Sequence, residues 1–256
     1  MGGKTRKYVL TGLMTALVFI LTYTFKVPVP YTSGYIHFGD SMIYVSVLVL
    51  GPIFGAFASG VGSMMADIIG GFPHFALPTF VIKSLMALIM GLILSAKTRK
   101  SSIASVITAL LIGVGFLAGT SLFLNQQITT MGSGRIIETV AGADADAETL
   151  SSLGKTLGNL PLYLLLGVAL LIVIFAFVGY FIARREASRL STIKSIVGMI
   201  AAGMCMVMGY FLVECFMYSP IAATFSIPMN LIQFIGGVTA AILLAPALRK
   251  ARLVID

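Results

Sequence analysis

The sequence repeats apolar runs that are each about as long as a membrane-spanning helix. One span needs about 20 apolar residues, and such runs recur along all 256 residues. Charged residues make up only 10% of the chain, against about 25% in soluble domains. The runs lack the alternation of a transmembrane β-strand, and in lipid such segments satisfy their backbone groups only as helices. We therefore expect one all-α, polytopic transmembrane bundle over residues 1–256, with no soluble catalytic domain.

The apolar runs divide into about eight spans. The second and third are joined at Leu50-Gly51-Pro52, where proline removes a backbone donor and glycine permits the turn. Because the second run is short, we expect it to begin inside the membrane or to tilt. The expected spans are residues 8–26, 40–51, 53–71, 78–96, 103–124, 161–183, 195–218 and 227–248.

Basic residues gather between spans and thereby predict an orientation. By the positive-inside rule, the side that carries the clusters faces the cytoplasm, and only Lys26, Arg135 and Lys155 fall on the other side. Both termini are then cytoplasmic, in a bacterial-type inner membrane. This distribution accounts for the net charge of +8 without a nucleic-acid partner. The clusters are Lys4/Arg6/Lys7, Lys97/Arg99/Lys100, Arg184/Arg185/Arg189/Lys194 and Arg249/Lys250/Arg252.

The external connection over residues 125–160 is the only long polar stretch. Within it, Leu150, Leu153 and Leu157 have the spacing of one face of a short helix. We expect either a solvated connector with one surface helix or a lid over an external site.

Polar residues inside the apolar spans are candidates for a binding site, because an ionisable group there costs several kcal/mol unless it is paired or hydrated. The expected topology places them all in the outer half of the membrane. That placement predicts a pocket on the outer side rather than a through-going channel. With His37 from the adjoining loop, the candidate substrate-binding residues are Asp40, Asp67, Lys83, Tyr210, Glu214, Asn230 and Gln233.

The charges of this set indicate the kind of ligand. Three carboxylates stand against Lys83, and we expect one of them to pair with it. The remaining acid favours a neutral or weakly cationic ligand that donates hydrogen bonds over a phosphate or carboxylate. Aromatic residues expected at the same level either stack on a flat ring or form an interfacial belt; they are Tyr31, Tyr35, Phe38, Tyr210 and Tyr218.

Known catalytic and metal-binding motifs are not found. The spacing of His37 and His74 relative to Asp40 and Asp67 matches no metal-ligand motif, so we expect no metal and no cofactor. The sequence has no Walker motif, nucleophile elbow or paired-histidine helix. We expect a protein that is not an enzyme and that would need partners to couple import to ATP hydrolysis.

A set of short segments in the first hundred residues and the last two spans carries a family resemblance. They are residues 34–40 (GYIHFGD), Leu50-Gly51-Pro52, Gly55-Ala56, Gly62, Ala66-Asp67, residues 77–83 (LPTFVIK), Gly209-Tyr210-Phe211, Glu214 and residues 230–233 (NLIQ). This set resembles the substrate-specific S components of energy-coupling factor (ECF) transporters, in the riboflavin-type or hydroxymethylpyrimidine/pyridoxine-type branch.

The resemblance implies a bundle that binds a vitamin near its outer face and docks on a membrane T subunit driven by two ABC ATPase subunits. It implies that small residues of the first helix contact the T subunit, which by position are Gly12 and Ala16. Because S components typically have six helices, it also implies a core of residues 1–100 and 195–250. Residues 101–190 then form an inserted helical hairpin with the external loop 125–160.

The resemblance and the polar residues together predict a high-affinity vitamin-binding subunit of an ECF-type importer. The alternative is an autonomous secondary transporter of a small polar or cationic solute.

Overall fold

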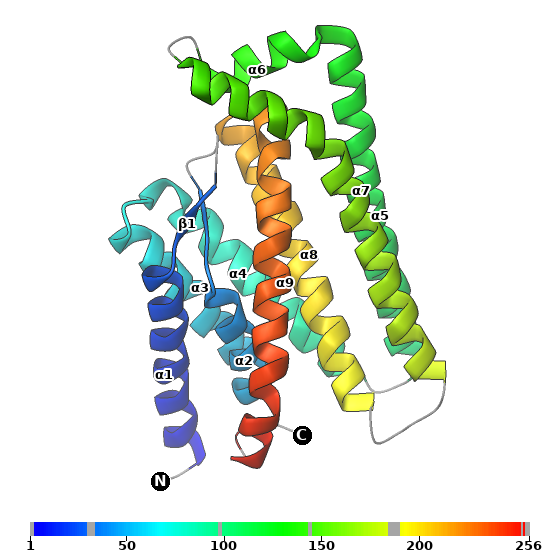
Figure 1. The fold of residues 1–256 in the computed structure, drawn as a ribbon. Helices are drawn as coiled ribbons and strands as arrows, with labels where there is room; N and C mark the ends of the chain where they lie inside the picture. Colours follow the sequence, from blue (N-terminus) through cyan, green and yellow to red (C-terminus); the bar gives the residue numbers. More distant parts are fainter. Residues whose placement is uncertain are drawn as a thin grey trace.

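Long helices that lie roughly side by side make up most of the chain in the computed structural model, which describes residues 3–29, 34–96, 99–142, 145–183, 190–251 and 253 (Figure 1). A two-stranded antiparallel hairpin, with Val27 opposite Ile36, follows the first helix. The elements are α1 (Gly3–Thr24), β1 (Val27–Pro28), β2 (Tyr35–Ile36), α2 (Gly39–Leu50), α3 (Pro52–Ile69), α4 (Pro73–Leu94), α5 (Arg99–Met131), α6 (Ser133–Ala141), α7 (Ala147–Ala183), α8 (Leu190–Met217) and α9 (Pro220–Lys250).

The helices confirm a polytopic membrane bundle. Within the described ranges, seven helices are long and apolar enough to cross a membrane, and α2 is a shorter apolar helix of 12 residues. Eleven residues of α2 are buried, because α1, α3, α4 and α9 surround it. This explains why α2 is apolar on every side. The predicted break is present: α2 ends at Leu50, Gly51 follows with a φ of 77° that suits glycine, and α3 begins at Pro52.

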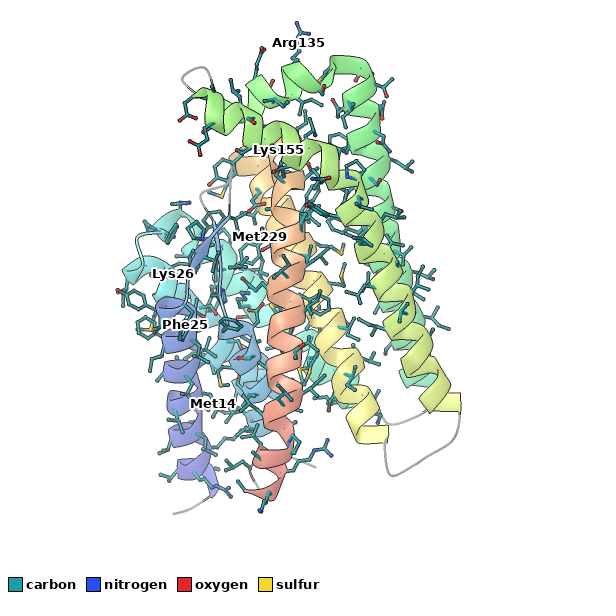
Figure 2. All side chains as sticks on the ribbon, viewed as in Figure 1. Met14, Phe25, Lys26, Arg135, Lys155 and Met229 are labelled. Atoms are coloured by element: carbon teal, nitrogen blue, oxygen red, sulfur yellow. The ribbon has the colours of Figure 1, made fainter. Side chains whose placement is uncertain are left out.

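The two ends of the bundle differ in charge. Both termini lie at the same end (Figure 1). Figure 2 shows Lys26, Arg135 and Lys155 away from that end, as the charge pattern predicts. Near the termini lie the start of α1, with Lys4, and the end of α9, with Lys250. Part of each of the other two clusters falls outside the described residues, namely Lys97, Arg184, Arg185 and Arg189, as does Arg252.

The helices α4 and α9 begin earlier than predicted, and for the same reason. The sequence predicts spans from residues 78 and 227, whereas α4 begins at Pro73 and α9 at Pro220. Pro78 and Pro228 resemble helix-starting prolines, but both helices run through them. The polar residues of α4 and α9 therefore lie deeper than expected, and Lys83 is halfway along α4 rather than near its outer end.

The predicted polar connector over residues 125–160 is largely helical. α5 continues to Met131, α6 follows, and α7 begins at Ala147. Leu153 and Leu157 share a buried face, as their spacing predicts, and they belong to one cluster with Ile136 of α6. α7 bends partway along its length (Figure 1), and Pro161 inside it accounts for a bend. The segment before Pro161 is thus the outer continuation of a long helix.

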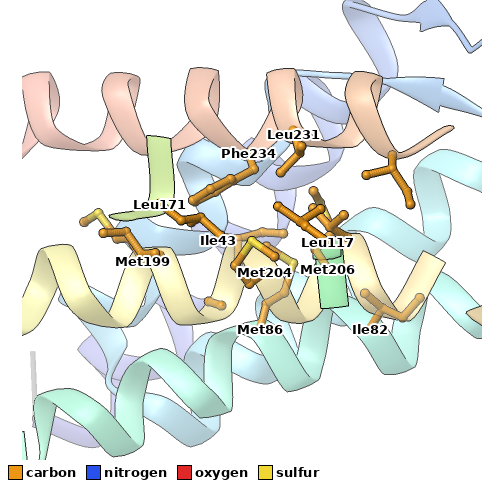
Figure 3. Packing of buried hydrophobic residues seen from close by; sticks show 14 of the residues in the cluster. Ile43, Ile82, Met86, Leu117, Leu171, Met199, Met204, Met206, Leu231 and Phe234 are labelled. Atoms are coloured by element: carbon orange, nitrogen blue, oxygen red, sulfur yellow. The ribbon is translucent and has the colours of Figure 1, made fainter. Parts of the chain in front are cut away.

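The core lies between α4, α8 and α9, with Met86, Met206 and Phe234 between these helices (Figure 3). The small residues of α3 serve internal packing, as predicted. A Cβ at Gly62 would come within 2.6 Å of the Thr15 carbonyl oxygen of α1, so α1 and α3 touch through this glycine. The helices α5 and α7 pack mainly on each other, and the hairpin that they form makes fewer contacts with α8 and α9.

Candidate functional site

A small cavity lies where the β1–β2 hairpin meets α3, α4, α8 and α9. Its volume is about 30 Å³, which is room for one or two waters. It contains polar groups from every helix around it, although it is surrounded by apolar spans. The lining residues are Val29, Gly34, Tyr35, His37, Asp67, Phe75, Thr79, Tyr210, Glu214, Asn230 and Gln233.

Asp67 supplies a carboxylate near the C-terminal end of α3. The Tyr35 hydroxyl donates a hydrogen bond to Asp67 Oδ1 at 2.5 Å, which ties the β-hairpin to α3. The other oxygen, Oδ2, is buried and meets no donor in hydrogen-bond geometry among the described residues, although the Thr79 hydroxyl lies close enough to interact with the carboxyl group. A buried carboxylate oxygen in this condition is costly, so Asp67 has an acceptor available to a ligand in the cavity.

Lys26 lies beside the same hairpin, held among aromatic rings. Its ammonium nitrogen is 4.6 Å from the ring centroid of Tyr23, 4.8 Å from that of Tyr35 and 5.3 Å from that of Phe72. Burial lowers the pKa of Lys26, and the Asp67 carboxylate partly opposes this. Burial, followed by the charge of Asp67, raises the pKa of the Tyr35 hydroxyl, which therefore keeps its proton.

A further part of the cavity wall comes from α8 and α9. Glu214 is 3% exposed and accepts a hydrogen bond from the Ser226 hydroxyl. Asn230 lies one turn further along α9, and its amide has no hydrogen bond to another described residue. Tyr210, one turn before Glu214, shares a 3.0 Å hydrogen bond with the Thr79 hydroxyl of α4.

Beneath the cavity is a fully buried ion pair. Lys83 Nζ donates to Asp40 Oδ1 at 2.5 Å, and neither side chain is exposed. Gln233 Nε2 donates to the second oxygen of Asp40 at 2.9 Å, while Met206 Sδ accepts from both Lys83 and Gln233. The Asp40 carboxylate and the Lys83 ammonium therefore neutralise each other, so the buried cluster beneath the cavity has no net charge.

His37 stands between the hairpin and this buried pair, in the loop before α2. Its backbone N–H donates to Gln233 Oε1 at 2.9 Å, and its Nδ1 accepts from the Gly39 N–H at 3.0 Å. Burial lowers the pKa of His37 to about 3, and the Lys83 ammonium adds to the shift. A neutral ring that accepts at Nδ1 carries its proton on Nε2, so His37 is a neutral hydrogen-bond donor.

The structure brings six of the eight predicted substrate-binding residues to the cavity wall. They are His37, Asp67, Tyr210, Glu214, Asn230 and Gln233. Asp40 and Lys83 are not part of the wall, because they pair with each other beneath it; the expected partner of Lys83 is thus Asp40. Of the candidate aromatic residues, Tyr35 and Tyr210 reach the cavity, Phe38 and Tyr218 do not, and Tyr31 lies outside the described residues.

Sequence reasoning missed Val29, Phe75 and Thr79, since such residues are common in spans and loops. A usable signal exists for two of them. Phe75, Thr79 and Lys83 recur at i, i+4 and i+8, the spacing of one helix face. Following that face from the charged residue would have found Phe75 and Thr79, whereas nothing in the sequence marks Val29.

Comparison with known proteins supplies independent information. A family model described as "ECF-type riboflavin transporter, S component" matches residues 3–166 and 149–250. An uncharacterized protein of Pyrococcus woesei is 45% identical over 74 residues, which are 29% of this chain and 49% of that protein. The chain thus spans about half the length of this curated relative. No solved structure matches the chain.

Proposed function

The chain belongs to the family of S components of ECF-type riboflavin transporters, as its sequence resemblance predicts, and we propose that it captures a flat heteroaromatic vitamin in the cavity beneath the β1–β2 hairpin. Riboflavin is the first candidate because of the family; pyridoxine and hydroxymethylpyrimidine are the alternatives. The family consists of transport subunits rather than enzymes, and the chain is a multi-pass membrane protein.

The proposal rests mainly on Asp67 Oδ2, a carboxylate oxygen in the cavity that meets no donor in hydrogen-bond geometry among the described residues. Other hydrogen-bonding groups in the same cavity are also available to a ligand. Asp67 Oδ2 accepts, the Asn230 amide both donates and accepts, and the His37 Nε2–H donates. A ring that carries N–H or O–H donors beside carbonyl or ring-nitrogen acceptors satisfies all three. Phe75 and Tyr210 border the same space and offer aromatic surface to such a ring.

The charged groups of the cavity wall restrict the class of ligand further. The cavity wall includes the carboxyl groups of Asp67 and Glu214 but no lysine or arginine among the described residues. Lys83 is neutralised by Asp40 below the wall. A phosphate would face these two acids, while the Lys26 ammonium lies among aromatic rings outside the wall, so the proposed ligand is the free vitamin and not its phosphate ester.

The β1–β2 hairpin is the proposed cover of the site. Small-molecule pockets usually measure about 300–1,000 Å³, so the cavity of about 30 Å³ must widen to take a ring. Among the described residues, two side-chain hydrogen bonds hold the hairpin side of the cavity, from Tyr35 to Asp67 and from the His37 N–H to Gln233. Breaking two hydrogen bonds is a modest cost compared with moving a packed helix, so we place ligand entry at the hairpin.

Transport requires partners, which we propose to be an ECF T subunit and two ABC ATPase subunits. Gly12 and Ala16 lie one turn apart on the exposed face of α1, and a Cβ at Gly12 would meet nothing within 4 Å. Small residues on a lipid-exposed helix face let a second helix approach closely. We propose this face of α1 as the T-subunit contact, in a bacterial-type inner membrane with both termini in the cytoplasm.

We also propose that the chain divides into an S-component core and an inserted helical hairpin. Residues 1–100 and 195–250 supply every residue of the cavity wall, in keeping with an S-component core. α5, α6 and α7 supply none of them and pack mainly on each other. We propose that residues 101–190, with the outer segment 125–160, form an addition to that core that borders the site without contacting the ligand.

Mass spectrometry of the small molecules that copurify with the full chain tests the function. The proposal expects one heteroaromatic vitamin at near-equimolar amount, and riboflavin would also give a yellow preparation. The ligand should disappear from an Asn230→Ala variant that remains monodisperse. If instead the purified chain alone, in liposomes, accumulates a solute in response to an ion gradient, it is an autonomous secondary transporter and the proposal is wrong.

A further inference from the structure

A second, larger cavity lies within the membrane-spanning part of the bundle, between α4, α5 and α8. Its volume is about 670 Å³, and its walls are almost entirely apolar. Ile89 and Ile93 of α4, Ala104 of α5, and Ala201 and Leu212 of α8 mark its extent. It shares no residue with the vitamin site.

The length of this crevice matches one leaflet of a bilayer. An α-helix rises 1.5 Å per residue, so the wall from Ala201 to Leu212 is roughly 16 Å long. The hydrocarbon core of a bilayer is about 30 Å thick, so the acyl chains of one leaflet reach about 15 Å. An apolar slot of this length, lined by spans on three sides, fits an acyl chain that enters from one membrane surface.

The basic residues at one end of the crevice indicate from which membrane surface the acyl chain enters. Ile93 and Ala104 lie at the end where α4 stops and α5 begins, and α5 starts with Arg99 and Lys100. At the same end the Lys194 ammonium donates to the Ala96 carbonyl, which uses one of its three donors. Basic residues between spans on the cytoplasmic side bind anionic lipid headgroups.

We propose that this crevice is a binding site for an anionic phospholipid of the inner leaflet. One acyl chain lies between α4, α5 and α8, and the phosphate lies at the basic end beside Lys194. The lipid would fill the space between the bundle and the α5–α7 hairpin, and its binding does not depend on the proposed vitamin function.

Native mass spectrometry of the full chain, with phosphatidylglycerol and phosphatidylcholine of identical acyl chains, tests the site. The parent protein should retain phosphatidylglycerol several-fold more than phosphatidylcholine. Ala104→Phe and Ala201→Phe fill the crevice and should reduce the phosphatidylglycerol adduct several-fold. Ala118→Phe, at an exposed position of α5 outside the crevice, should leave it unchanged. Ala104 is exposed, so its variant keeps the test valid if the partly buried Ala201→Phe misfolds.

The headgroup is tested separately. Lys194→Gln should remove the preference for phosphatidylglycerol while phosphatidylcholine retention stays as it was, and Lys194→Arg should keep the preference. Equal retention of both lipids by the parent protein would overturn the proposal. So would equal effects of Ala104→Phe and Ala118→Phe, or a dimer that Ala104→Phe dissociates while neither lipid is retained, since a second copy would then occupy the crevice.

Discussion

Lys83 Nζ lies 2.5 Å from Asp40 Oδ1, and both side chains are fully excluded from solvent. The pair joins α4 to the short helix α2 directly beneath the candidate vitamin site. Gln233 extends it to α9 through a 2.9 Å hydrogen bond to Asp40. Three helices that are distant in sequence are therefore held together by one charged cluster that also forms the floor under the cavity.

Removing one member of this pair should destabilise the fold strongly. Lys83→Met leaves Asp40 without its cation, and breaking a buried pair typically costs about 3–5 kcal/mol. Thermal unfolding in detergent, followed by circular dichroism, should show a large fall in midpoint for Lys83→Met and for Asp40→Leu. The double variant should recover most of the loss, because no unpaired charge remains. Additive losses in the double variant would contradict the pairing.

Asp67→Asn should weaken vitamin binding without unfolding the protein. A hydrogen bond to a charged group contributes about 1.5–3 kcal/mol, so we expect the Kd to rise by roughly tenfold to a hundredfold. Equilibrium dialysis of the purified variant measures this. Ser63→Ala is the matched control, because Ser63 is buried on the same helix, lies outside the cavity wall and has an unpartnered hydroxyl. A similar loss of affinity in both variants would show that the substitutions disturb α3 as a whole and not a contact with the ligand.

His37 should make stability depend on pH. Its folded pKa of about 3 lies below the ordinary value of 6.5, so below about pH 6.5 the unfolded chain binds a proton that the folded chain does not. Stability is complete above pH 6.5 and falls as the pH drops toward 3, by up to about 2 kcal/mol between pH 7 and pH 5. Midpoints measured across this range should fall for the parent and fall less for His37→Asn, whose side-chain oxygen can still accept from Gly39. Identical slopes would show that another group titrates.

Bulky residues on α1 should separate binding from uptake. Gly12→Phe and Ala16→Phe place large side chains on the proposed T-subunit contact, so uptake by cells that contain all subunits should be lost while the purified variants still bind the vitamin. Leu17→Phe is the control, because Leu17 is half-buried and lies about 100° around the helix from Ala16 and about 140° from Gly12. Loss of binding along with uptake would show that these residues support the fold rather than docking.

Much of the candidate site could be predicted from the sequence, because polar residues are rare in apolar spans. Asp67, Glu214 and Asn230 stand out for this reason, and all three reach the cavity wall. The sequence could not show which acid pairs with Lys83, since the contact between α2 and α4 is tertiary. Asp40 was therefore expected in the site, whereas it lies beneath it.

The apolar character of the spanning helices was predictable, but their ends and the short helix α6 were less so. Pro78 and Pro228 look like helix starts, yet the apolar residues before them continue each helix outward. The β1–β2 hairpin was not predicted, because strands of two residues carry no periodic signal. The leucine spacing predicts a short helix before Pro161, but it does not show that α6 packs on this helix or that the helix continues through Pro161 into the span.

Titration of the purified, ligand-free chain with riboflavin, followed by riboflavin fluorescence, measures directly whether the chain captures a vitamin. Pyridoxine and hydroxymethylpyrimidine are tested as competitors, and the phosphate ester of riboflavin is titrated in parallel. The structure predicts saturable one-to-one binding of a free vitamin, much weaker binding of its phosphate ester, and a large loss of affinity in Asp67→Asn and Asn230→Ala. Failure of all three vitamins to bind, or binding that neither substitution changes, would contradict the assignment of this cavity.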